Sequence, residues 1–180
     1  RIGVARTFQK PRLMPSLSVL DNAVLGAWTH AGAGFLATAF ALPSVRREEL
    51  AHREAIEKVL GFVGLAPHRH TLVGALPFGV QKLVGFARAL ALEPKLLLLD
   101  EPSAGLNRAE REDLARFILR IKDEIGLAMI WIEHDMQMVA DLADRLHVLD
   151  YGRTLGVGTA ADVLNNPAVI AAYIGTKPVG

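Results

Sequence analysis

The chain has 180 residues, 51% of them hydrophobic and 22% charged, which provides enough apolar side chains for one or two compact cores and excludes a disordered tail. Because 20 Lys and Arg residues almost balance 19 Asp and Glu residues, without a long basic run, we expect no nucleic acid as a partner. The absence of cysteine excludes a disulfide framework, a thiolate metal site and a cysteine nucleophile.

Residues 1–10 are expected to form an edge of an α/β core, since the segment 2–8 (IGVARTF) has the pattern of a strand. The chain starts with Arg1 rather than methionine, directly before this strand. We therefore expect it to be part of a longer polypeptide.

Residues 11–92 are predicted to form a helical subdomain. Its uncharged stretch 23–45 is long enough to cross a membrane, but the glycines and threonines within it lower its hydropathy and helix propensity. We interpret this stretch as an apolar surface that docks on a partner. Apolar residues at three- and four-residue spacing then predict a helix that starts at Arg46, and a second helix starts near Gly79.

Residues 93–180 are predicted to form an α/β core with a C-terminal strand and helices. The run KLLLLDEP (95–102) is typical of a strand buried on both faces of a parallel sheet, and LAMIWIEHD (127–135) predicts a second buried strand. A helix capped by Asn107 and closed by Gly126 lies between them. Further strands in 145–150 and 154–158, with helices capped at Thr159 and Asn166, complete an α/β fold with a parallel sheet.

The strongest chemical signal is the pair of acids at the end of the first buried strand. Parallel α/β sheets build phosphate and metal sites at this end of their strands. Asp100 would hold Mg²⁺, directly or through water, and Glu101 would polarise a water for attack on a γ-phosphate. Taken alone, the same residues are explained equally well as a strand that ends in a turn.

His134 follows the second buried strand in the same way, within WIEHD. Parallel neighbours bring their carboxyl ends together, so a neutral imidazole there would hydrogen-bond a γ-phosphate and sense its presence. Two alternatives stay open: a structural histidine paired with Glu133 or Asp135, and a metal ligand. The metal alternative is weak because the chain has no cysteine and no second histidine three or four residues on.

Five short segments follow one another along the chain: FQ (8–9), LPFGVQ (76–81), LLLLDEP (96–102), SAGLN (103–107) and EHD (133–135). Their order and spacing resemble those of ATP-binding cassette (ABC) ATPases, over practically the whole chain. The resemblance implies the C-terminal part of an ABC-type nucleotide-binding domain, a parallel sheet with flanking helices plus a helical subdomain. It also implies ATP hydrolysis coupled to transport, with Mg²⁺ as cofactor.

The resemblance implies a catalytic role for three side chains and a metal-binding role for a fourth. Gln9 resembles the Q-loop glutamine, which contacts the catalytic Mg²⁺ and water. Asp100 resembles the Walker B aspartate, a Mg²⁺ ligand, and Glu101 resembles the catalytic glutamate. His134 resembles the switch histidine.

Two further segments resemble parts that complete the site of the opposite subunit in an ATP-sandwiched dimer. These are the signature motif at 76–81 and the D-loop at 103–107. The implied nucleotide contacts besides Asp100 are Pro77, Phe78, Gly79, Val80, Gln81, Ser103 and Gly105. Pro77 and Phe78 replace the usual serine and first glycine of the signature, so the serine contact to phosphate is lost. Gly79 remains, and we expect a working but altered motif.

No G-x-x-x-x-G-K-[ST] sequence occurs in the 180 residues. In this family that loop binds the β- and γ-phosphates and supplies a Mg²⁺ ligand. We therefore expect this chain alone neither to bind ATP tightly nor to hydrolyse it.

The region 11–75 and the ending NNPAVIAAYIG (165–175) resemble the ATPase subunits of branched-chain amino acid importers. This implies a location in the cytoplasm, peripheral on the inner face of the cell membrane. The implied partners are transmembrane permease subunits, a second ATP-binding subunit that is identical or different, and indirectly a periplasmic or extracellular substrate-binding protein. Alternatives are an ABC ATPase for urea, amides or lipopolysaccharide, a soluble ABC ATPase without transport, and an inactive remnant.

The resemblance also gives the uncharged stretch 23–45 a role as the surface that receives the membrane subunits. We predict that a charged residue in place of Phe35 or Phe40 uncouples transport and spares the ATPase activity of the complete subunit. Uptake into vesicles and phosphate release are the measurements. Unchanged uptake by both variants would contradict the docking role.

Overall fold

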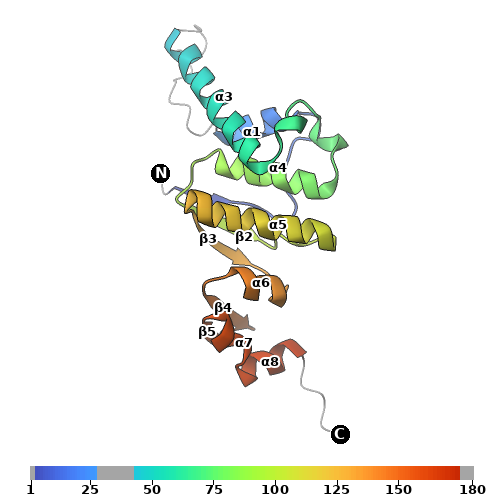
Figure 1. Cartoon of the computed structure of the whole chain (residues 1–180), viewed down its shortest axis with the longest axis vertical. Coiled ribbons are helices and arrows are strands. Elements are labelled where there is room, and N and C mark those ends of the chain that lie inside the picture. The colour runs from blue at the N-terminus through green and yellow to red at the C-terminus, as the bar shows by residue number, and fades with distance from the viewer. Residues whose placement is uncertain (1–2, 28–42, 175–180) are drawn as a thin grey trace. The chain divides into compact units, whose positions relative to one another are not determined.

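A computed structural model describes residues 3–27 and 43–174 (Figure 1). The chain divides into two compact units, Arg1–Ile132 and Glu133–Gly180. Each unit is described by itself. Among the described residues, every helix is too short or too polar to span a lipid bilayer.

The first unit contains a parallel sheet of three strands in the order β1-β2-β3: β1 (Val4–Arg6), β2 (Leu96–Asp100) and β3 (Ala128–Ile132). Leu96 of β2 lies opposite Val4 on one side and opposite Ala128 on the other. The run of four leucines is therefore the central strand. Leu97 and Leu99 are buried, but Leu96 and Leu98 are half-buried, so the predicted burial on both faces is found in full on one face only. The N-terminal segment is an edge of this sheet, which confirms that expectation as well.

The expectation that the second strand is buried was wrong. In β3, Ile130 and Ile132 are 59% and 64% exposed. The reason is that β3 is an edge strand and alternate side chains of a strand point to opposite faces of the sheet. Val4 of β1 is exposed on the same face, so the described helices of this unit leave that face open.

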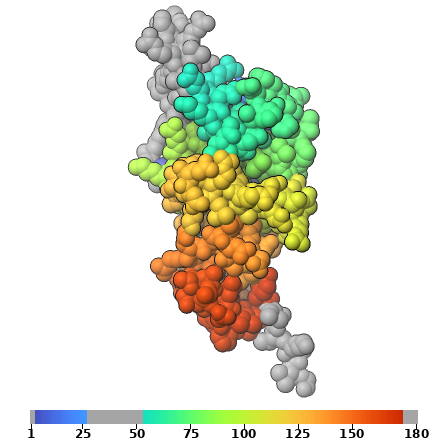
Figure 2. All heavy atoms as spheres, in the orientation of Figure 1, coloured from blue at the N-terminus to red at the C-terminus, as the bar shows by residue number. Residues whose placement is uncertain are grey.

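Helices of the first unit surround a common apolar core. Its helical part consists of α1 (Val19–Ala27), α3 (Pro43–Val63), two short 3₁₀ turns, η2 (Ala66–His68) and η3 (Val73–Ala75), and α4 (Phe78–Leu90). The ring of Phe86 on α4 meets the ring of Phe117 on α5 edge-on, with centroids 5.3 Å apart, and Phe62 on α3 lies 5.8 Å from Phe117. Figure 2 shows α3 (cyan) and α5 (yellow) next to each other on the surface of this unit.

The helix α5 (Arg108–Arg120) begins where the sequence predicted. The Asn107 side chain accepts a hydrogen bond from the Glu110 amide, and the Glu110 carboxylate accepts one from the Asn107 amide. The helix continues as a π-helical turn, η4 (Ile121–Ile125), and ends at Gly126. This wider turn rotates its last residue away from the apolar face. Ile125, predicted on that face, is consequently 50% exposed.

The second unit consists of α6 (Met136–Leu142), β4 (Leu146–Asp150), β5 (Arg153–Gly158), α7 (Ala160–Leu164) and α8 (Pro167–Ile174). The strands β4 and β5 form an antiparallel hairpin rather than part of the parallel layer that alternation of strands and helices suggested. Thr159 caps α7 through a reciprocal pair of hydrogen bonds with Asp162, as predicted. Asn166, predicted to cap the next helix, accepts a hydrogen bond from the Ala168 amide.

The predicted docking stretch 23–45 lies mostly outside the described residues, and so do Phe35 and Phe40. Its first residues, 23–27, form the last turns of α1. They pack closely on α4, because a Cβ atom added to Gly26 would overlap the carbonyl oxygen of Arg88.

This close approach predicts that Gly26→Ala destabilises the chain by about 1–3 kcal/mol, because α1 must move away from α4 to admit the methyl group. Urea unfolding measures the change. Gly61→Ala on α3 is the matched control, since nothing lies within 4 Å of its added Cβ. Alanine has the higher helix propensity, so the control should be more stable by about 0.5–1 kcal/mol. Equal free energies of unfolding for the two variants would contradict the tight α1–α4 contact.

Candidate functional site

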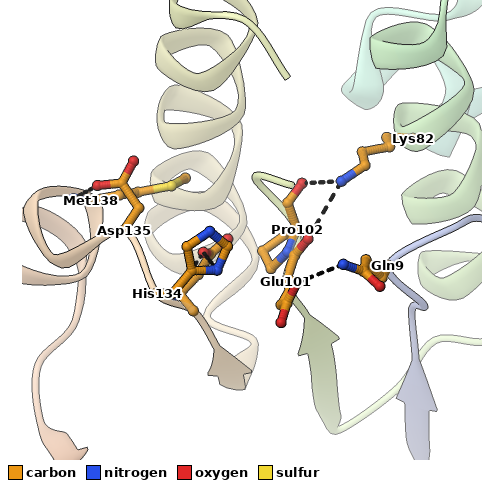
Figure 3. A network of polar contacts seen from close by, with 8 residues as sticks. Gln9, Lys82, Glu101, Pro102, His134, Asp135 and Met138 are labelled. Atoms are coloured by element: carbon orange, nitrogen blue, oxygen red, sulfur yellow. Dashed lines mark hydrogen bonds and ion pairs between the residues drawn. The ribbon is translucent and has the colours of Figure 1, made fainter. Parts of the chain in front are cut away.

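The carboxyl ends of β1 and β2 bring two of the predicted catalytic residues into contact. The Nε2 atom of Gln9 donates a hydrogen bond of 2.6 Å to Oε2 of Glu101 (Figure 3). Gln9 follows β1 and Glu101 follows β2, and these strands are paired neighbours in the sheet. The parallel sheet therefore joins the Gln9 amide to the Glu101 carboxylate.

Glu101 has a left-handed backbone conformation, with φ of +44°. This conformation costs roughly 1–2 kcal/mol for a residue with a side chain. The Glu101 amide donates a hydrogen bond of 2.9 Å to the carbonyl of Ile132, and its own carbonyl accepts one of 3.1 Å from Ala104. Both backbone groups are thus fixed, and the side chain turns away from the line of β2 toward Gln9.

Asp100, the last residue of β2, forms an ion pair with Arg6 of β1. The distance from the guanidinium Nη2 to Oδ2 is 2.7 Å, and the two side chains are 53% and 31% exposed. The Arg6 guanidinium also lies 5.0 Å from the centre of the Phe8 ring. The neighbouring acids therefore have different partners: Asp100 has a cation, and Glu101 has an amide.

Lys82 is a site residue that sequence reasoning missed. It lies on α4, is only 5% exposed, and donates hydrogen bonds to the carbonyl oxygens of Pro102 (2.7 Å) and Glu101 (3.4 Å). A signal was present in the sequence, because Lys82 occurs at helical spacing from the buried Phe86 and Ala89 and so belongs to an apolar face. A lysine on such a face needs acceptors for its ammonium group.

The segment resembling the signature motif forms the start of α4. Pro77 precedes its first turn, and the Phe78 side chain is 41% exposed. A Cβ atom on Gly79 would lie 2.5 Å from a carboxylate oxygen of Glu110. The Gln81 side chain donates a hydrogen bond of 2.9 Å to the carbonyl of Leu76, so it stays within its own loop. Val80 lies in the same first turn.

The segment resembling the D-loop follows Glu101 directly. Ser103 is buried, with 5% exposure, and its carbonyl accepts a hydrogen bond from the Leu106 amide. Gly105 has φ of +77°, a conformation that favours glycine, and the Phe78 ring lies beside it. The loop therefore contacts the start of α4 within the first unit.

His134 belongs to the second unit, which is described by itself. It lies two residues after the end of β3, and its side chain is 70% exposed. Its backbone amide donates a hydrogen bond of 3.1 Å to Oε2 of Glu133, and the imidazole Nδ1 lies 3.9 Å from the same oxygen. Asp135 caps α6 by accepting a hydrogen bond from the Met138 amide (Figure 3).

A small divalent cation can use the side-chain oxygens of Asp100, Glu101 and Gln9 only if a bound ligand supplies further oxygens. Among the described residues, no group of three or more His, Asp or Glu side chains forms a ready metal site. Mg²⁺ is usually bound by one or two carboxylates together with substrate phosphates and waters. The residues at this sheet edge fit that mode of binding.

A pocket of about 410 Å³ opens beside this sheet edge. The segment that contains Arg6 and Phe8 forms one wall, and α1 and α4 form the others. Its lining is largely apolar, with Met14, Leu25 and Phe86 among the contributors. Leu25 belongs to the uncharged stretch that the sequence marked as a docking surface.

Comparison with protein families gives two matches. The family described as "ABC transporter" matches residues 1–104, and the family described as "Branched-chain amino acid ATP-binding cassette transporter" matches residues 153–178. The high-affinity branched-chain amino acid transport ATP-binding protein BraF of Pseudomonas aeruginosa is 37% identical over 178 residues, which are 97% of this chain and 69% of BraF. The corresponding protein LivG of Escherichia coli is 35% identical over the same shares.

Solved structures of ABC transporter proteins are also similar to this chain. The ADP conformation of MJ1267, an ATP-binding cassette of an ABC transporter, superposes with a TM-score of 0.77 at 31% identity, covering 96% of this chain and 68% of that one. The cbiO1 protein of Clostridium perfringens, part of the ABC transporter complex cbiONQ, has a TM-score of 0.75 at 27% identity. That match covers 94% of this chain and 62% of cbiO1.

The Arg6–Asp100 ion pair predicts that Arg6→Met strengthens binding of a divalent cation, because the guanidinium and the metal compete for the same carboxylate. An exposed ion pair of this kind corresponds to a change of about two- to fivefold in affinity. Mn²⁺ binding to the assembled transporter in the presence of a non-hydrolysable ATP analogue, followed by electron paramagnetic resonance, measures it. Arg12→Met is the control, because Arg12 stacks on the same Phe8 ring at 5.2 Å without pairing with Asp100. An equal Mn²⁺ affinity in both variants would refute the competition.

Proposed function

Because the chain belongs to the ABC transporter family, we propose that it is the ATP-hydrolysing subunit of an importer for branched-chain amino acids. The contact between Gln9 and Glu101 is the observation that carries this proposal. It supports pairing of the Q-loop amide with the carboxylate that acts on water.

Glu101 acts as the general base in this proposal. Its carboxylate lies at the end of a buried strand, and Gln9 approaches it from the neighbouring strand. A carboxylate there accepts a proton from a water as the water oxygen bonds to the γ-phosphorus, while the bond from that phosphorus to the β–γ bridging oxygen breaks and ADP leaves. Gln9 orients the carboxylate and the water through its amide.

Asp100 and Gln9 would hold Mg²⁺ together with oxygens of the bound nucleotide. Such a cation would supply positive charge that offsets the charge developing on the phosphate oxygens. Asp100 offers the carboxylate, which is paired with Arg6 in this structure. Arg6 therefore balances the negative charge of Asp100 while no nucleotide is bound.

The signature and D-loop segments act across a dimer of ATP-binding subunits in this proposal. Residues 77–81 would face the nucleotide of the partner, with first-turn N–H groups of α4 directed to phosphate. Ser103 and Gly105 would contact the same interface through the D-loop. His134 would hydrogen-bond the γ-phosphate, and its 70% exposed side chain supports access to such a ligand.

Transmembrane permease subunits are the proposed direct partners, and a substrate-binding protein acts through them. The apolar pocket beside Phe8 supports this, because Leu25 and Gly26 of the uncharged stretch 23–45 line it. A subunit docked there is peripheral on the inner face of the membrane.

Branched-chain amino acids are the proposed cargo. The match of residues 153–178 to the branched-chain amino acid family supports this choice, as do BraF and LivG over nearly the whole chain. The cargo passes through the permease, so the substrate class rests on these comparisons.

Glu101→Gln tests the function in the assembled transporter. We expect ATP-driven leucine uptake and phosphate release to fall by about 10²–10⁴-fold, because an amide cannot accept the proton from water. Binding of ATP should persist. Glu112→Gln is the matched control, since this acid lies on the exposed face of α5 and pairs with Arg108. Full hydrolysis by the Glu101→Gln transporter would disprove the catalytic role, and uptake of urea in place of leucine by the unaltered transporter would disprove the cargo.

A further inference from the structure

We propose that Lys82 is a positioning residue for Glu101, and that it makes the orientation of the catalytic carboxylate depend on the signature helix α4. This inference rests on the proposed function of Glu101. It concerns a residue outside the set that the sequence motifs identified.

The Lys82 ammonium group is buried and directed to two consecutive carbonyls. It lies 2.7 Å from the oxygen of Pro102 and 3.4 Å from the oxygen of Glu101, and the residue is 5% exposed (Figure 3). Hydrogen bonds from a charged donor are stronger than those between neutral groups. Lys82 therefore joins α4 to the loop that carries Glu101.

Glu101 needs such a contact because its backbone is strained. With φ of +44°, it adopts a conformation that a residue with a side chain rarely takes. Its amide is held by Ile132 and its carboxylate by Gln9. Lys82 holds its carbonyl and the next one, which fixes the peptide plane between Glu101 and Pro102.

A second contact links the same two elements. The Phe78 ring, in the altered signature segment, has its centre 5.5 Å from the Lys82 ammonium. The space beside Gly105 in the D-loop is filled by the same ring, whose Cε1 would lie 3.1 Å from an added Cβ. Phe78 thus supports both Lys82 and the loop after Glu101. Phe78, which replaces a glycine of the usual signature, therefore contacts Lys82 and Gly105 of its own subunit.

Movement of α4 is consequently transmitted to Glu101. If the start of α4 shifts when it meets the nucleotide of a partner subunit, Lys82 carries that shift to the two carbonyls. The Glu101 peptide plane then turns, and the carboxylate moves relative to Gln9. In this proposal Lys82 acts only through Glu101.

Amide hydrogen exchange on the purified chain tests the positioning without any hydrolysis. In Lys82→Met, we expect the amides of Glu101 and residues 103–106 to exchange about tenfold faster or more, because the loop loses two hydrogen bonds from a charged donor. In Lys82→Arg, exchange should stay within about twofold of the unaltered chain, since a guanidinium can reach both carbonyls. Unchanged exchange of residues 101–106 in Lys82→Met would overturn the proposal.

Arg88→Met is the matched control for removing a cation from α4. Arg88 lies on the same helix and donates to the carbonyl of Arg12, a residue of another loop. Its loss should speed exchange around residues 11–14 and leave residues 101–106 unchanged. Faster exchange of 101–106 in this control as well would mean that α4 has loosened as a whole, which overturns a specific role of Lys82.

Hydrolysis by the assembled transporter separates positioning from simple stability. We expect Lys82→Met to lower kcat for ATP by about tenfold or more, with KM within about twofold, and Lys82→Arg to restore most of kcat. A rise in KM with unchanged kcat would overturn the proposal. If Lys82→Met does not fold, Phe78→Leu, which keeps the ammonium and removes the ring, should give a smaller loss of kcat. An unaltered transporter without hydrolysis would contradict the proposed function, and the exchange experiment would still decide the role of Lys82.

Discussion

Glu101 adopts a left-handed backbone conformation at the end of β2, and the geometry of the site depends on that conformation. A residue that continued the strand would place its side chain on one face of the sheet. Here the chain turns instead, and the carboxylate meets Gln9. The strained conformation persists because the amide, the carbonyl and the carboxylate of Glu101 each have a hydrogen-bond partner.

The partners come from separate parts of the first unit. Gln9 follows β1, the carbonyl of Ile132 belongs to β3, and Lys82 belongs to α4. The sheet and the helix therefore both hold Glu101, and neither element alone fixes its position.

The altered signature segment follows the same principle. Pro77 stands where the resemblance places the usual serine, and Phe78, in place of the first glycine, makes contacts inside its own subunit. A larger residue does not fit in place of Gly79, because its Cβ atom would overlap the side chain of Glu110, the acid that caps α5. The segment is thus constrained by packing against the D-loop and α5 as well as by any nucleotide.

Local features of this protein were determined by the sequence itself. The caps at Asn107 and Thr159, the central strand of four leucines and the acids after it depend on residues close together in the chain. Motif order also indicated the family. Tertiary structure alone decided the Gln9–Glu101 contact between residues 92 positions apart, the burial of Lys82 and the exposure of β3. The physical reason is that such contacts and burial depend on which strands and helices become neighbours in space. The periodicity of residues along the chain does not determine those neighbours.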